Sequence, residues 1–251
     1  MGALHRGHTA LVDAVRDRCD TVVLSIFVNP TQFNVAADFE KYPRTLEADL
    51  DIATAAGVNA VYLPAADDMY RAGHDTTVHV DRTSAPLEGA GRPGHFDGVA
   101  TVVTKLFNAV RPDVAAFGMK DYQQLAVVTR MASDLDTGVE ILPVPTVRES
   151  DGLALSSRNA RLDEAQRQAA PVVHAALRSV SDAFTSGTTE VPALRDVFVR
   201  VIGGEPLARL EYVSISDASS LADIEVVRSH AVVSCAVWFG DVRLIDNILL
   251  P

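Results

Sequence analysis

The first eight residues, MGALHRGH, hold two histidines three positions apart, with a glycine between them. Thr9 is a candidate N-cap, because apolar residues follow it at helical spacing, so His8 is expected where a loop becomes a helix. The first N–H groups of a helix lack intrahelical partners and carry partial positive charge, which favours anions. Gly7 lets a phosphate approach the backbone, and the imidazoles of His5 and His8 could donate to it. The alternative is a pair of ordinary surface histidines beside a helix cap.

Two more polar clusters could serve the same chemistry. Lys120-Asp121, with Gln123 and Gln124, follows an apolar run, and Ser156-Ser157-Arg158 lies in a turn-prone stretch. Together with the histidines they offer imidazoles, an ammonium, a guanidinium and hydroxyls, the donors that stabilise a triphosphate as its charge moves toward pyrophosphate. A lysine at a helix N-terminus is electrostatically disfavoured, which favours a bound anion there. Taken alone, each cluster also fits a solvated helix start or loop.

Composition limits the possible classes of protein. The 251 residues are 48% hydrophobic, enough for one large domain or two modest ones. No apolar run reaches the roughly 18 residues of a membrane span, and no basic-then-apolar leader is present, so a cytoplasmic protein is expected. Cys19 and Cys235 have no metal-ligand spacing and are expected as free thiols. The net charge of −11 argues against a general nucleic-acid surface, so a phosphate site must be a local positive cluster.

Strand-like and helix-like stretches alternate from residue 9 to residue 144, which predicts a parallel sheet covered on both faces. The apolar run 21–28 is expected as a strand buried on both faces, and the turn 29–33 follows at its carboxyl end, where open α/β sheets bind ligands. The remaining predictions are helices over 45–56 (Leu46, Leu50 and Ala53 sharing a face), 99–110 and 122–135, strands over 60–63, 77–80, 114–117 and 140–144, and a loop over 88–98.

The pattern changes after Pro145. A long helix over 163–185 and a second over 191–202 precede β-like runs at 210–216, 231–239 and 242–250. Helices followed by strands predict a smaller α+β domain.

Eight motifs run nearly from end to end. They are Met1–His8 (MGALHRGH), Phe27–Phe33 (FVNPTQF), Tyr42–Thr45 (YPRT), Arg92–Val99 (RPGHFDGV), Gly118–Leu125 (GMKDYQQL), Pro145–Glu149 (PTVRE), Asp151–Asn159 (DGLALSSRN) and Asp246–Ile248 (DNI). Through them the chain resembles the pantothenate synthetase (pantoate–β-alanine ligase) family. The resemblance implies an α/β fold, with a Rossmann-like nucleotidyltransferase (HxGH) parallel sheet over residues 1–146 and a C-terminal α+β lid domain over 147–251, in a homodimer. It also implies synthesis of pantothenate from (R)-pantoate, β-alanine and ATP with Mg²⁺, through a pantoyl adenylate that yields AMP and diphosphate.

The resemblance implies roles for individual residues as well. His8 matches a proton donor and His5 its phosphate-binding companion, and Lys120 and Arg158 complete the expected catalytic set. Gln32 and Gln124 match two glutamines that hold pantoate, Gln32 being associated also with β-alanine. Asn29 belongs to the same pocket, and Asp49 matches an acidic residue near the metal. The expected ATP-binding residues are Met1, Gly2, Ala3, Leu4, His5, Arg6, Gly7, His8, Gly118, Met119, Lys120, Asp121, Val147, Leu155, Ser156, Ser157 and Arg158.

Physical chemistry agrees with these roles. Attack of a carboxylate on the α-phosphate brings two anions together, so positive groups must hold the phosphates. Two amides can read the hydroxyls of pantoate through both donors and acceptors without adding charge. The alternative for Gln32 and Gln124 is a pair of solvent-facing amides.

The chain departs from the family pattern at several positions. Arg6 and Met119 stand where the family commonly has Glu, and Leu155 where it has Met. Ala48 replaces one of two adjacent acidic residues, which weakens the metal assignment of Asp49.

The start of the sequence is the largest departure. Family members carry a strand ending in Pro-Thr before the residue that matches Met1. We therefore expect Met1 to be an internal methionine of a longer natural chain, and the 251-residue form to have a strand-wide gap beside residues 21–28, weak ATP binding and slow turnover. Two other hypotheses remain open. One is a nucleotidyltransferase acting on a phosphate ester, which would need more basic residues to bind that acceptor. The other is a truncated chain that folds but has no turnover.

Overall fold

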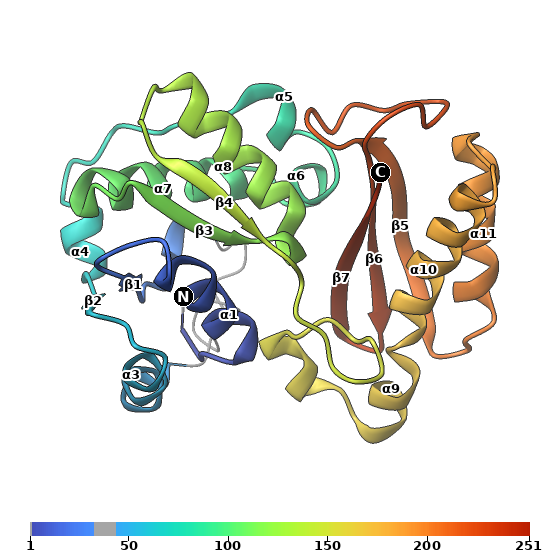
Figure 1. Ribbon diagram of the computed structural model, residues 1–251, viewed down its shortest axis with the longest axis horizontal. Coiled ribbons are helices and arrows are strands. Elements are labelled where there is room, and N and C mark those ends of the chain that lie inside the picture. Colours follow the sequence, from blue (N-terminus) through green and yellow to red (C-terminus); the bar gives the residue numbers. More distant parts are fainter. Residues whose placement is uncertain (1, 33–43) are drawn as a thin grey trace. The chain divides into compact units, whose positions relative to one another are not determined.

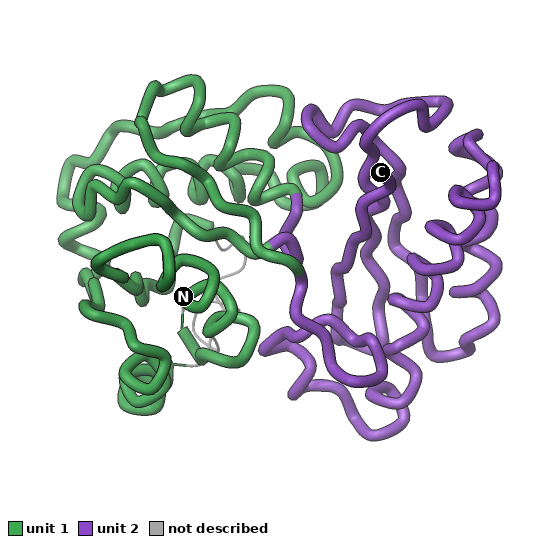
Figure 2. Tube along the Cα trace, in the orientation of Figure 1, with its two compact units in different colours: residues 1–118, 123–145 green, residues 119–122, 146–251 purple. Residues whose placement is uncertain are grey.

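The computed structural model describes residues 2–32 and 44–251, which form two compact units (Figure 2). The first unit comprises residues 1–118 and 123–145, and the second comprises residues 119–122 and 146–251. The sequence predicts one boundary after residue 146. The structure instead divides the chain after residue 145 and also assigns the segment 119–122 to the second unit. Lys120 therefore belongs to the second unit, although it directly follows a strand of the first.

The first unit alternates strands and helices (Figure 1). Its elements are α1 (Arg6–Arg16), β1 (Val23–Ser25), η1 (Pro30–Gln32), α3 (Leu46–Ala55), β2 (Ala60–Tyr62), α4 (Ala66–Met69), α5 (Asp81–Ser84), α6 (Glu88–Gly91), α7 (His95–Val110), β3 (Val114–Gly118), α8 (Tyr122–Asp134, from its second residue onward) and β4 (Glu140–Val144). β1 pairs with β2 and β3 with β4, both in parallel. This arrangement confirms the α/β class. Among the described residues the two pairs are not joined by hydrogen bonds into one sheet.

β1 is buried on one face only, and the prediction of two buried faces is wrong. Val22, Leu24 and Ile26 pack in a core with Val12 of α1, whereas Val23 between them is 38% exposed. Alternate residues of a strand point to opposite faces, so the helix covers one set only. The apolar face predicted for α3 is buried only in part: Ala53 is buried, but Leu46 and Leu50 are exposed.

Three other predicted elements differ. Residues 77–80 form no strand, and Val78 donates its N–H to Thr101 Oγ1 (2.9 Å) instead. The glycine-rich stretch 88–98 is not a loop, since it holds α6 and the first turn of α7, where Phe96 is buried. The long helix over 163–185 is broken into α9 (Glu164–Ala169) and α10 (Val172–Thr185) at Pro171, whose nitrogen has no hydrogen to donate.

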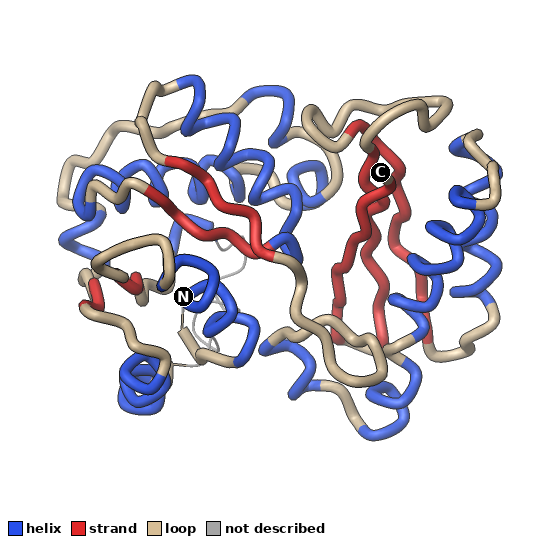
Figure 3. Tube along the Cα trace, viewed as in Figure 1, coloured by secondary structure: helices blue, strands red, loops and turns tan. Residues whose placement is uncertain are grey.

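The second unit is the expected α+β domain (Figure 3). It contains η2 (Met119–Asp121), η3 (Ser157–Arg161), α9, α10, α11 (Val191–Gly203), β5 (Ala208–Asp217), β6 (Ala231–Phe239) and β7 (Val242–Leu250). The strands form an antiparallel sheet in the order β5-β6-β7. α10 and α11 pack on one face of this sheet around Leu177, Phe198 and Val233, which are almost fully buried. Within residues 2–32 and 44–251, no helix is long and apolar enough to cross a membrane.

Candidate active site

The two histidines cap the first helix between them. His5, not Thr9, is the N-cap of α1: its Nδ1 accepts from Gly7 N (3.1 Å), and His8 Nδ1 accepts from His5 N (3.2 Å). The ring centroids are 4.1 Å apart. The prediction favoured Thr9 because hydroxyls are common caps, but an imidazole nitrogen accepts equally well in this geometry. Because both Nδ1 atoms accept, each neutral ring carries its proton on Nε2, the atom that would donate to a phosphate.

A buried carboxylate holds the loop before this helix. Asp49 of α3 is only 2% exposed, and its oxygens accept from Ala3 N (3.0 Å), Leu4 N (2.7 Å) and Thr45 Oγ1 (3.2 Å). Ala3 has a left-handed backbone (φ 49°), a strained conformation that such bonds help to hold. The carboxylate therefore ties the loop to α3. The expected role of Asp49 near the metal stays a prediction; the described residues contain no group of three His, Cys, Asp or Glu side chains that could hold a metal ion.

Asn29 is engaged by protein groups. It is 2% exposed, its Oδ1 accepts from Tyr70 Oη (2.8 Å) and Thr31 Oγ1 (2.9 Å), and its Nδ2 donates to Gly98 O (3.0 Å). A longer contact of 3.4 Å joins Nδ2 to Gln32 Oε1. These bonds give Asn29 a structural role, which is to shape the turn that carries Gln32; its expected role in substrate binding stays a prediction.

The motif at residues 92–99 clamps the same turn, a role that the sequence reasoning missed. Arg92 Nη2 (3.0 Å) and His95 Nδ1 (2.9 Å) both donate to Gln32 O. A Cβ added to Gly98 would lie 2.7 Å from Thr31 O, so this position requires glycine. The signal available in the sequence was Gly98 itself, directly before the apolar run 99–110, since glycine there can mark a close backbone approach.

The adjacent glutamines of α8 have different surroundings. Gln123 is 6% exposed, donates from Nε2 to Pro86 O (2.7 Å) and Thr83 O (3.1 Å), and accepts at Oε1 from Glu88 N (3.0 Å). Gln124 is half-buried, and its side chain has no hydrogen-bond partner within the described part of the chain. Gln123 is thus a structural residue, and Gln124 is the one whose amide is available to a ligand.

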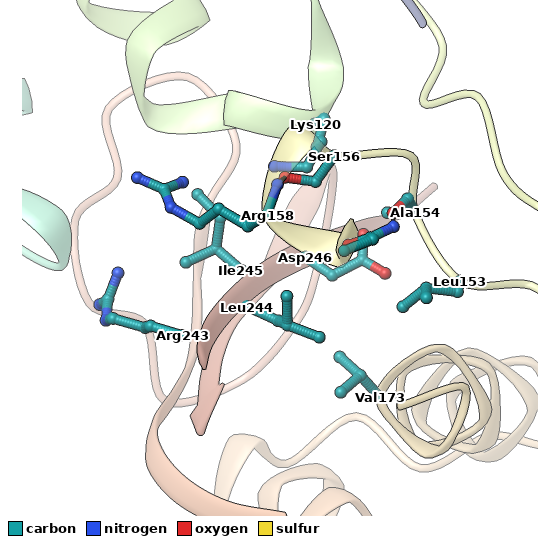
Figure 4. A pocket seen from close by; sticks show the side chains of 11 residues that line it. Lys120, Leu153, Ala154, Ser156, Arg158, Val173, Arg243, Leu244, Ile245 and Asp246 are labelled. Carbon is teal, nitrogen blue, oxygen red and sulfur yellow. Dashed lines mark hydrogen bonds between the residues drawn. The ribbon is translucent and has the colours of Figure 1, made fainter. Parts of the chain in front are cut away.

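The second unit gathers the other predicted cations around one pocket (Figure 4). Lys120 lies in η2 with its side chain 17% exposed and Nζ 3.8 Å from Asp121 Oδ1. Ser156 caps η3, since its Oγ accepts from Arg158 N (3.2 Å). The structure thus brings Lys120, Ser156 and Arg158 together, as expected. The polar side chains that line this pocket belong to Lys120, Ser156, Arg158, Asn159, Arg243 and Asp246.

Arg243 is a lining cation that the sequence reasoning missed, because it is a single arginine within an apolar strand. Its Nε and Nη2 donate to both carboxylate oxygens of Glu211 (2.8 and 2.9 Å). These bonds lower the pKa of Glu211, so the pair remains ionised.

Most of the other residues expected to bind ATP lie in turns or at the ends of helices and strands. Leu155 N donates to Val147 O (2.9 Å), which pairs the two segments on either side of the turn before η3. Gly118 ends β3, Met119 begins η2 and Ser157 begins η3. Gly2 is buried, Arg6 is exposed, and Met1 lies outside the described residues.

Comparisons with known proteins agree with one another. The sequence model of a family described as pantoate-beta-alanine ligase matches residues 1–249. Proteins named pantothenate synthetase from Moorella thermoacetica and Geotalea uraniireducens are 50% and 51% identical over 250 residues, which is all of this chain and 88% and 89% of theirs. The crystal structure of pantothenate synthetase from Thermus thermophilus matches with a TM-score of 0.95 and 44% identity, over 99% of this chain and 90% of that one. Pantoate-beta-alanine ligase from Francisella tularensis, crystallised with beta-gamma ATP and beta-alanine, matches with a TM-score of 0.80 and 32% identity, over 99% of this chain and 87% of that one.

Proposed function

Because the chain belongs to the pantoate–β-alanine ligase family, we propose that it joins pantoate to β-alanine in two steps through a pantoyl adenylate. In the first step a carboxylate oxygen of pantoate attacks the α-phosphorus of ATP, and diphosphate leaves. In the second step the amine nitrogen of β-alanine attacks the acyl carbon, AMP leaves with the C–O electron pair, and the nitrogen loses a proton. The overall reaction is the ATP-dependent ligation that defines the family.

The observation that carries the proposal is the pocket that gathers Lys120, Ser156 and Arg158 in a chain of net charge −11. A local cluster of cations and hydroxyls in a repelling overall field suits an anionic ligand such as a polyphosphate. Lys120 and Arg158 would bind the phosphates as charge builds on the leaving diphosphate. In the first unit, His5 and His8 would donate from Nε2, because each Nδ1 already accepts a backbone N–H.

Two glutamines are the residues proposed to bind pantoate. The amide of Gln124 has no hydrogen-bond partner among the described residues, and the backbone and side chain of Gln32 are held by Asn29, Arg92 and His95. Neutral amides can bind both the hydroxyls and the carboxylate of pantoate while leaving that carboxylate nucleophilic. The same neutrality argues against the competing function, nucleotidyl transfer to a phosphate ester, since that acceptor would want cations at these positions.

Mg²⁺ would accompany ATP in this proposal. It prefers oxygen ligands and commonly binds through substrate phosphates together with one or two carboxylates. We also expect a homodimer working in the cytoplasm, where the thiols Cys19 and Cys235 would stay reduced. Sedimentation of the purified protein tests the dimer.

A coupled assay for AMP tests the function. AMP should form with ATP, pantoate and β-alanine present, and omission of either organic substrate should abolish its steady release. Diphosphate release with pantoate alone, limited to about one equivalent per site, would support the adenylate. AMP or diphosphate release that requires a phosphorylated acceptor instead would overturn the proposal.

A further inference from the structure

Asp246 and Asn247 of β7 contact two segments of the second unit that hold or adjoin the residues expected to bind phosphate. β7 runs through these two residues in regular antiparallel register, with Asp246 opposite Cys235 and Asn247 opposite Ser234. Successive side chains of a strand point to opposite faces. The two adjacent polar residues therefore serve two different faces of the sheet.

Asp246 lies on the face of the sheet that carries α10 and α11. It is 5% exposed and accepts from Arg148 Nη1 (2.6 Å) and Nη2 (3.0 Å) in a two-pronged ion pair. Arg148 Nη1 also donates to Gly152 O (3.1 Å), which closes the turn that leads into Ser156 and Arg158. The ion pair thus fixes the segment that carries the serine and arginine cluster.

Asn247 serves the other face and is 6% exposed. Its Nδ2 donates to two successive carbonyls, Met119 O (2.8 Å) and Lys120 O (2.9 Å). Tyr122 Oη adds a third bond from the same segment, to Ala218 O (2.9 Å). The backbone of Lys120 is therefore held from β7 directly, in the same unit as the pocket that its side chain lines.

We propose that Asn247 is a positioning residue for Lys120: its amide holds the 119–120 carbonyls so that the lysine ammonium meets the phosphates of ATP. The adjacent Asp246 holds the segment of Ser156 and Arg158, so one strand sets the spacing of both cationic groups. This inference rests on the proposed function. Small displacements of a catalytic group lower rates steeply, so loss of the two bonds should slow adenylate formation about tenfold to a hundredfold.

A double-mutant cycle separates positioning from stability. Asn247→Ala should lower the single-turnover rate of diphosphate release in the wild-type background, but change it less than twofold in a Lys120→Ala background. Asn247→Asp keeps the shape of the side chain but cannot donate when ionised, so it should be at least as slow. Val233→Ala, in the core on the opposite face, serves as a control that lowers stability without touching the Lys120 segment.

The second step provides another readout. Conversion of supplied pantoyl adenylate and β-alanine to pantothenate involves no diphosphate, so the Asn247 variants should retain its rate. An equal loss in both Lys120 backgrounds, an equal loss in both steps, or a wild-type rate for both Asn247 variants would overturn the inference. Melting temperatures verify that each variant is folded. A wild-type enzyme that released no AMP from its substrates would refute the proposed function itself, before any variant is compared.

Discussion

The loop before α1 and the segment before α8 are each held by one buried polar side chain from a distant part of the sequence, but the two side chains have opposite hydrogen-bonding character. Asp49 accepts from two backbone N–H groups, at Ala3 and Leu4. Asn247 donates to two carbonyls, at Met119 and Lys120. The loop before a helix presents unpaired N–H groups, whereas the segment after β3 presents carbonyls to β7. The backbone group that a loop leaves unpaired thus decides which side chain can anchor it.

The two anchoring side chains also differ in charge. A carboxylate gives strong bonds to N–H groups but adds a negative charge beside a predicted phosphate loop, whereas an amide adds none. In the first unit, three donors to the two oxygens of the buried Asp49 partly compensate this charge.

Removal of the cations themselves should have the largest effect. Lys120→Ala and His8→Ala should each slow adenylate formation by about 10²–10³, because each removes a donor to the developing charge. The melting temperature should change little in Lys120→Ala and fall modestly in His8→Ala, because His8 also accepts the N–H of His5 at the start of α1. Single-turnover diphosphate release with saturating ATP and pantoate measures the rate. A rate close to that of the wild type in either variant would contradict the assignment of that residue.

Asp49→Asn should have the next largest effect and tests the anchor in the first unit. The new amide can accept one backbone N–H but turns its own NH₂ toward the other, so the histidine loop loosens and the rate falls about tenfold to a hundredfold. Urea denaturation should report about 1–3 kcal/mol less stability, the usual cost of an unsatisfied buried group. Added Mg²⁺ should not restore the rate. Recovery at high Mg²⁺ would instead support the metal role for Asp49.

The adjacent glutamines of α8 allow a matched comparison. Gln124→Ala should weaken pantoate binding by about 1–3 kcal/mol and leave ATP binding and stability unchanged. Gln123→Ala should lower the free energy of unfolding by a similar amount, since it removes bonds to Pro86 O, Thr83 O and Glu88 N. Calorimetric titration with each ligand and urea denaturation measure the two effects. Equal effects of both variants on pantoate binding would show that α8 does not divide these roles.

The smallest expected effect is a pH dependence of the stability of the second unit. Burial lowers the pKa of His174 below its usual 6.5, and the charge of Arg148 adds to this, so the folded state favours a neutral imidazole. The ring also packs against Gly152, where a Cβ would lie 2.3 Å from Nδ1. A lowered pKa contributes stability above the unfolded value that is lost as the pH falls below about 6.5. The urea concentration at the midpoint of unfolding should decrease as the pH is lowered from 7.5 to 5.5. His174→Gln should make this decrease smaller, and an unchanged decrease would exclude His174 as its source.

Prediction from sequence succeeded where local patterns suffice. β4, β6 and β7 begin and end where the apolar runs do, and α11 extends one residue further than expected. It failed where tertiary packing overrides local preference. The glycine-rich stretch 88–98 becomes helical because α7 buries His95 and Phe96, and β1 has one exposed face because a single layer covers it.

For the site, residue types and spacing indicated His5, His8, Lys120, Ser156 and Arg158 as phosphate-binding candidates, because few other side chains can offer positive charge and donors together. Their partners could not be read in the same way. Asp49 is 45 residues from Leu4, and Asn247 is 127 residues from Lys120. Nothing in a local pattern indicates which buried side chain satisfies a distant loop.

The amino-acid sequence by itself determined the class of the fold and the family, and it indicated candidate groups for binding phosphate, because apolar periodicity and rare polar motifs are local properties. Only the tertiary structure decided which polar residues are free to serve a ligand and which hold the backbone. The side chains of Asn29 and Gln123 are hydrogen-bonded to other protein groups, whereas that of Gln124 has no such partner among residues 2–32 and 44–251. The physical reason is that a buried polar group must find a partner, and which partner it finds depends on the packing of the whole unit.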